Sequence, residues 1–292
     1  IVKNVAEYAS QVMMVQAGDI DVALNVDAEQ AKQLASAEGV QVVDYQSLVI
    51  SFLIMNCDPA YGPIADPLVQ KAIRLAVDYQ GIQAMAGEGT ITPLAPFAVG
   101  LFGSVAPIDP ATVTDIEAAK ALMAQAGYAD GFTVDFYVPT STVQSVELLL
   151  LAQKVQNDLN QIGITTNIIP EDIMVSLETY RNGQQNIGLW YWSPDYPDNS
   201  SNLAFLPGQS VGLRANWQAE MNQELADLGA QAATESDPYA RAELLAQIQR
   251  IMGEDSPFVV LCQFKGQFAA RSTLTAAEYN DRYQLDLRTI GK

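Results

Sequence analysis

Strand-like and helix-like segments alternate along the chain, and this alternation most limits the folds that the sequence can adopt. Asp66-Pro67 and Asp237-Pro238 each predict the start of a helix, because aspartate caps a first turn and proline is tolerated at the first helical position. Helical spacing continues from the first of these as far as Ile82. Residues 132–138 alternate apolar and polar side chains, which is typical of a strand. The sequence therefore predicts an α/β fold.

The same criteria assign most of the remaining chain. We expect helices over residues 28–37, 117–126, 146–162, 175–181 and 217–233, and strands over residues 40–45, 48–56, 165–169, 186–192 and 258–264. Residues 87–114 carry four prolines and four glycines without a clear period. They also carry Leu94, Phe97, Leu101 and Phe102, so we expect a long but ordered surface loop.

Charge and hydropathy exclude several classes of partner. The 34 acidic and 15 basic residues give a net charge of −19, which opposes binding to nucleic acid or to an anionic membrane surface. The longest apolar runs are too short to cross a bilayer. The chain begins at Ile1 without a methionine, and we expect it to be the remainder of something longer.

Histidine is absent from all 292 residues, which removes Ser-His-Asp triads, Cys-His pairs and histidine metal ligands from this chain. Cys57 and Cys262 are too far apart in sequence to form a zinc motif. We therefore expect no metal and no cofactor. Each cysteine lies in an apolar run, so we expect two buried free thiols, while a disulfide stays open because its geometry cannot be judged from sequence.

The candidate site is the segment that follows the strand expected over residues 186–192. Trp190, Trp192 and Tyr196 offer flat apolar faces, and Asp195 offers a fixed negative charge. These residue types favour a pocket that holds a ligand without transforming it. Asp195 and Asp198 are also the obvious carboxylate pair for a hydrolase, but they lie only three positions apart within a proline-containing turn. We expect Asp198 to cap a turn.

Five stretches of the sequence carry a family resemblance. They are residues 17–23 (AGDIDVA), 66–78 (DPLVQKAIRLAVD), 117–128 (EAAKALMAQAGY), 156–164 (QNDLNQIGI) and 192–198 (WSPDYPD). In this order, and together over nearly the whole chain, they resemble the dipeptide and oligopeptide-type solute-binding proteins of ABC transporters, which form family 5 of the extracellular solute-binding proteins.

The resemblance implies a two-lobed periplasmic-binding-protein-like (type II) fold that lacks the N-terminal part of its first lobe. Residues 1–48 would belong to the first lobe and residues 49–257 to the second. Residues 258–292 would form the crossover strand and return to the first lobe. By this mapping both cysteines lie near the hinge between the lobes.

The resemblance also implies a function, which is to capture a peptide or another small polar solute between the lobes of a monomer and to deliver it to the membrane permease. Such proteins are periplasmic or are cell-surface lipoproteins, and they are not enzymes. Asp195 matches the family carboxylate that pairs with a peptide's amino group. Residues 140–145 lack the arginine that clamps the carboxylate in dipeptide-binding members, so longer peptides, opines, oligosaccharides and amine-bearing solutes stay open as ligands. Arg214 is the nearest candidate for an anionic group. A carboxylate-based hydrolase and a periplasmic chaperone or scaffold are the alternative functions.

Overall fold

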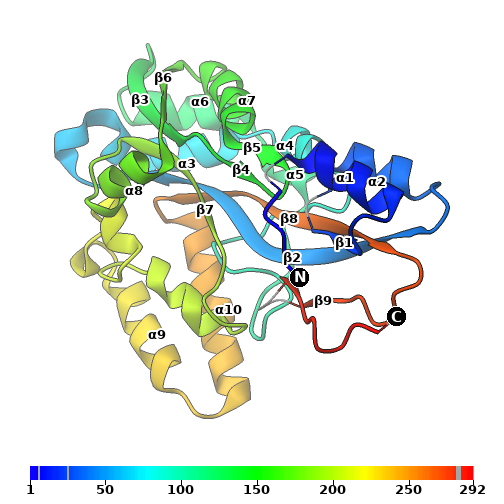
Figure 1. Cartoon of the computed structure of the whole chain (residues 1–292). Helices are drawn as coiled ribbons and strands as arrows, with labels where there is room; N and C mark the ends of the chain where they lie inside the picture. The colour runs from blue at the N-terminus through cyan, green and yellow to red at the C-terminus, as the bar shows by residue number, and fades with distance from the viewer. Residues whose placement is uncertain (6, 25, 281–283, 292) are drawn as a thin grey trace.

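A six-stranded mixed sheet forms the centre of the computed structural model, which describes residues 1–5, 7–24, 26–280 and 284–291 (Figure 1). Its strand order is β1-β8-β2-β7-β3-β6. The strand β2 pairs antiparallel with β7 and β8, whereas β3 runs parallel to both β6 and β7. The predicted α/β class is confirmed. The strands are β1 (Val22–Ala23), β2 (Val40–Met55), β3 (Phe132–Pro139), β6 (Ile164–Glu171), β7 (Ile187–Trp192) and β8 (Phe258–Arg271).

Two long strands, β2 and β8, run side by side through the molecule (Figure 1). The sequence predicted two strands where the structure has β2 alone, with a register shift between Gln46 and Ile50. At this register shift the amide of Val49 donates to Ser47 Oγ at 3.1 Å, so a bond to a side chain takes the place of a backbone bond between the strands. The strand β8 continues to Arg271, beyond its predicted end, because its second half pairs with residues 40–46.

Separate hydrophobic clusters pack against the two halves of this strand pair. On one side of the register shift, α3, α4, α6 and α7 cover one face of the sheet, and α9 and α10 cover the other. On the other side, α1 and α2 cover one face, and Leu274, Ala277 and Leu285 contribute to a cluster on the other. The assignment of residues 1–48, 49–257 and 258–292 to two lobes stays a prediction, and its first boundary falls at the register shift.

Most helices begin where the capping signals placed them. Asp66 Oδ1 accepts from the amide of Leu68 at 2.8 Å, and Asp237 Oδ1 accepts from two amides of α10. The helices are α1 (Tyr8–Ala17), α2 (Ala28–Leu34), α3 (Pro67–Ala76), α4 (Tyr79–Ala86), α5 (Pro110–Val113), α6 (Ile116–Gln125), α7 (Leu148–Asn160), α8 (Ile173–Arg181), α9 (Gln223–Thr234) and α10 (Pro238–Glu254). None of the described helices is long and apolar enough to span a membrane.

Several boundaries differ from the prediction for local reasons. The helix expected to continue to Ile82 ends at Ala76, because Asp78 caps a second helix through the amide of Gly81. The helix expected from residue 146 begins at Leu148, since the preceding two residues form β5 (Val146–Glu147) in a short hairpin with β4 (Thr142–Val143). The helix expected from residue 217 begins at Gln223, after the cap at Asn222.

The long loop over residues 87–114 is ordered, as predicted, and it packs into the core. Phe97 is buried, whereas Phe102 keeps 46% of its surface exposed. Gln263 of β8 ties the loop to the sheet, because its backbone bridges to Ile91 and its side chain bonds to both backbone groups of Val99. The loop is therefore a fixed part of the fold.

Candidate functional site

The carboxyl ends of β3, β6 and β7 meet at one edge of the sheet, where open α/β sheets bind ligands. In the parallel register, Tyr137 of β3 lies beside Gly188 and Pro139 lies beside Glu171. Trp192, the last residue of β7, pairs with Ile50 at the register shift of β2. The predicted site segment therefore leaves the sheet at this edge, next to the point where β2 and β8 continue into the far half of the molecule.

Three of the predicted site residues lie together in this segment. Trp192 is half-buried, donates from Nε1 to Asn202 Oδ1 at 2.9 Å, and packs edge-on against Phe205. Tyr196 keeps 48% of its surface exposed, with its hydroxyl 3.1 Å from Ser200 Oγ. Asp195 is exposed, and its amide donates to the hydroxyl of Ser201. Two aromatic faces and a carboxylate thus border one exposed turn.

Trp190 and Arg214 lie elsewhere, and both contact Tyr180. Trp190 is 3% exposed, stacks on the Tyr180 ring at 4.3 Å between centroids, and donates from Nε1 to Gln185 Oε1. The Arg214 guanidinium lies 4.8 Å from the centroid of the same tyrosine ring. Burial raises the pKa of Tyr180 to about 12, against the opposing charge of Arg214. Trp190 therefore contributes to the core, and the ligand-binding role of all five predicted residues stays a prediction.

Asp198 caps a turn, as the sequence predicted. Its Oδ1 accepts from the amide of Ser200 at 2.8 Å at the start of η2 (Asn199–Phe205), and it pairs with Arg241 of α10. Burial alone would raise the pKa of Asp198, but the bonds from Ser200 and Arg241 outweigh burial and lower it. A carboxylate held charged in this way suits a structural role.

The two cysteines are both free, as predicted from the sequence. Cys262 is buried in β8 opposite Ser51, whereas Cys57 follows β2 and is half-buried. Six residues of extended chain separate Ser51 from Cys57, about 20 Å at strand spacing. A disulfide needs Cα atoms within about 7 Å, so this spacing keeps the two thiols apart. That both cysteines lie near the hinge stays a prediction. No group of three or more metal-ligating side chains occurs among the described residues.

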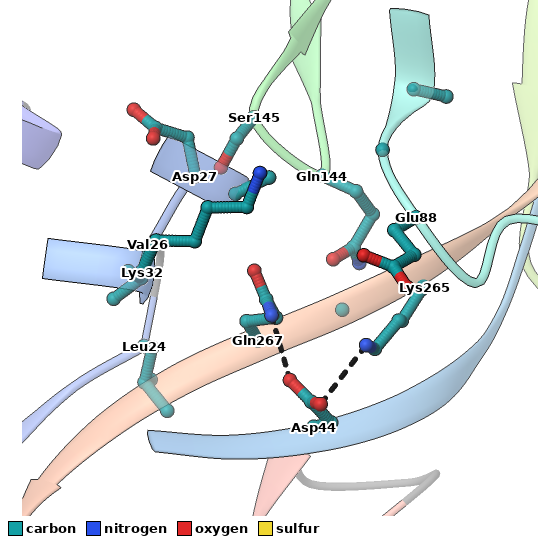
Figure 2. Close-up of a pocket in the computed structure, with 14 residues that line it drawn as sticks. Leu24, Val26, Asp27, Lys32, Asp44, Glu88, Gln144, Ser145, Lys265 and Gln267 are labelled. Carbon is teal, nitrogen blue, oxygen red and sulfur yellow. Dashed lines mark hydrogen bonds and ion pairs between the residues drawn. The ribbon is translucent and has the colours of Figure 1, made fainter. Parts of the chain in front are cut away.

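A polar cavity of about 280 Å³ lies on the strand pair between α2, the end of α4 and the β4–β5 turn (Figure 2). Asp44 of β2 and Lys265 of β8 form an ion pair at its floor, and Gln267 also donates to Asp44. The turn residues Gln144 and Ser145 have φ angles of 48° and 67°, the left-handed region that glycine usually occupies. Sequence reasoning missed this cavity, since neither turn residue is a glycine and its lining follows no motif.

Comparisons with known proteins identify what this chain is similar to. The profile of "Bacterial extracellular solute-binding proteins, family 5 Middle" matches residues 1–212. "Heme-binding protein A" of Haemophilus influenzae is 25% identical over 91% of this chain and 48% of its own length. "Glutathione-binding protein GsiB" of Salmonella paratyphi A is 27% identical over 94% and 54%. The chain therefore spans about half the length of these curated relatives.

One solved structure gives the comparison of folds. It is the "ABC transporter-associated periplasmic binding protein DppA from Helicobacter pylori in complex with peptide STSA". The TM-score is 0.80 at 21% identity, over 97% of this chain and 56% of that one. At this identity the likeness concerns the fold alone.

Proposed function

Because the chain belongs to family 5 of the bacterial extracellular solute-binding proteins, we propose that it forms part of the ligand-capturing protein of an ABC importer. The expected fold class is confirmed, since periplasmic binding proteins share this fold over nearly the whole chain. We propose that the complete protein closes two lobes around a peptide or another small polar solute and delivers it unchanged to the membrane permease.

The observation that carries this proposal is the exposed turn after β7. It presents Trp192, Asp195 and Tyr196 at the edge of the sheet where β2 and β8 leave for the other half of the molecule. In the proposed complex, the Asp195 carboxylate accepts the ligand's ammonium group, and the two rings flank the chain that follows. Trp190 and Arg214, which both contact Tyr180, are the remaining residues proposed for the site.

Among the named ligands of relatives, a peptide fits this wall best. The Helicobacter pylori protein is described in complex with the peptide STSA, and GsiB is named for glutathione. Another relative is named for haem, which has no ammonium group to pair with Asp195. We accordingly propose a ligand with a free amino group, bound without catalysis, in the periplasm or at the cell surface.

Calorimetric titration of the intact protein with the peptide Ser-Thr-Ser-Ala and with glutathione tests the function. The Asp195→Asn variant removes the charge from the proposed ammonium pair, and we expect affinity to fall by about 10- to 100-fold. The matched control is Asp130→Asn, because Asp130 is an exposed aspartate that precedes β3 at the opposite edge of the sheet. Equal affinities in all three proteins would disprove the role of Asp195. Turnover of either ligand would instead indicate an enzyme.

A further inference from the structure

A buried chain of hydrogen bonds links Trp192 to the tip of the loop that carries Phe102. Trp192 Nε1 donates to Asn202 Oδ1 at 2.9 Å, and Asn202 Nδ2 donates to Asn199 Oδ1 at 2.8 Å. Asn199 Nδ2 then donates to the carbonyl of Phe102 at 2.9 Å. Both asparagines are fully buried. Two segments about 90 positions apart in sequence are therefore joined by hydrogen bonds that two asparagine side chains make.

The chemical groups at its two ends fix the direction of this chain of hydrogen bonds, which we call the asparagine relay. An indole N–H can only donate and a backbone carbonyl can only accept, so each amide has one orientation that satisfies both of its neighbours. Truncating either asparagine would leave a buried donor or acceptor without its partner. The relay therefore behaves as a unit, in which a change at one end displaces groups at the other.

Phe102 is held from several sides, although 46% of the residue's surface is exposed. The Arg241 guanidinium, which pairs with Asp198, lies 5.8 Å from the ring centroid. Next to the ring, Gln249 of α10 accepts from the amide of Val105 and donates to the carbonyl of Gly103. Phe102 therefore presents part of an apolar ring to solvent from a loop that is anchored on two sides.

We propose that Phe102 is a further wall of the ligand site and that Asn199 and Asn202 are positioning residues that hold it in register with Trp192. This inference rests on the proposed function and names a finer ligand class, a peptide with an apolar side chain that packs on the Phe102 ring. Because the ring is already held in place, contact with it costs little conformational entropy, and its burial adds directly to affinity.

Titration of the intact protein with Ala-Phe-Ala and with Ala-Ala-Ala tests the wall. We expect the parent to prefer Ala-Phe-Ala by about fivefold, the gain from covering the exposed half of one aromatic ring. Phe102→Ala should abolish this preference, because the ring that favours Ala-Phe-Ala is removed. The control Tyr239→Ala should keep it, since Tyr239 is an exposed aromatic on the first turn of α10. An unchanged preference in Phe102→Ala would overturn the inference. Failure of the parent to bind either peptide would refute the proposed function as well.

Fluorescence tests the relay without any ligand. The contribution of Trp192 to the emission is the difference between the spectra of proteins with and without Trp192→Phe. In the Asn199→Ala background we expect this contribution to shift to longer wavelength and to become more accessible to acrylamide. The same emission and quenching as in the parent, in a folded variant, would disprove the relay. Should Asn199→Ala fail to fold, Arg241→Ala loosens the Phe102 loop from the surface, and it should weaken the preference for Ala-Phe-Ala. An undiminished preference there would count against the inference.

Discussion

Gln263 is the side chain that fastens both the register shift and the long loop to β8, so its replacement by leucine should be strongly destabilising. The residue is fully buried, and its Nε2 donates to the carbonyls of Ser47 and Val99, each at 2.9 Å. Its Oε1 accepts from the amide of Val99 at 2.7 Å. Leucine has a similar size and can form none of these bonds, so the packing is largely kept while the polar groups lose their partner.

The magnitude follows from these three bonds. Each buried hydrogen bond contributes about 1 kcal/mol, so Gln263→Leu should lower the free energy of unfolding by about 3 kcal/mol. An unfolding entropy of about 2.1 cal/mol/K per residue gives about 0.6 kcal/mol/K for this chain, and the melting temperature should fall by about 5 °C. Gln267→Leu is the matched control. It lies on the same strand and makes one exposed bond, to Asp44, so the loss should stay below about 1 kcal/mol.

Scanning calorimetry and urea denaturation of the parent and the two variants measure these differences. If Gln263→Leu costs no more than Gln267→Leu, water replaces the glutamine amide at the register shift. The argument that one side chain holds both segments would then be wrong. If the variant loses the expected stability, the fluorescence of Trp192 should also change, because the loop that Gln263 fastens carries Phe102, whose carbonyl accepts from Asn199.

Two further predictions concern thiols and acid. Burial raises the pKa of Cys57 to about 12 and raises that of Cys262 as well, so both should resist a thiolate-specific reagent at pH 8 and both should react in denaturant without reductant. Rapid native reaction would contradict the burial, and no reaction in denaturant would indicate a disulfide. The folded-state pKa of Asp198 lies below its ordinary value of 3.8, so its stabilising effect is present above that pH and is lost as pH falls through the folded-state value. Asp198→Asn should therefore be less stable than the parent at pH 7 and should approach it in urea denaturation near pH 3. A constant difference at both pH values would contradict this.

Capping signals in the sequence predicted those helices whose starts depend only on neighbouring residues. The Asp-Pro pairs placed the starts of α3 and α10, because the caps act within a few residues of their own positions. The helix α1 was missed, since Glu7 makes no side-chain cap bond and the helix carries no strongly amphipathic pattern. The continuity of β2 was missed too. Its polar middle resembles a break between strands, and only the pairing partner β8 shows that the strand continues.

The sequence likewise predicted one part of the candidate site and missed the rest. The sequence located the turn after β7, because aromatics and carboxylates gather there within a few positions. It could not separate Trp190 from Trp192, which point to the same face of one strand. Their exposure differs because Tyr180 covers the first and the second lies at the strand's end. Phe102 was expected as one of several apolar residues in a loop, and only the fold brings its carbonyl to Asn199.

Side-chain amides rather than backbone ladders fix the mutual geometry of the loop and the turn after β7. Gln263 and Gln249 bond to the loop on either side of Phe102, at Val99 and at Gly103. Asn199 and Asn202 join Phe102 to Trp192. The strands and helices of the core do not depend on these four residues for their own hydrogen-bond ladders. Substitution at the amides can therefore shift the position of the aromatic walls while the sheet keeps its order and register. A fold with this construction can vary the ligand that it accepts without rebuilding its core, which is consistent with relatives of one fold that are named for haem, for glutathione and for peptides.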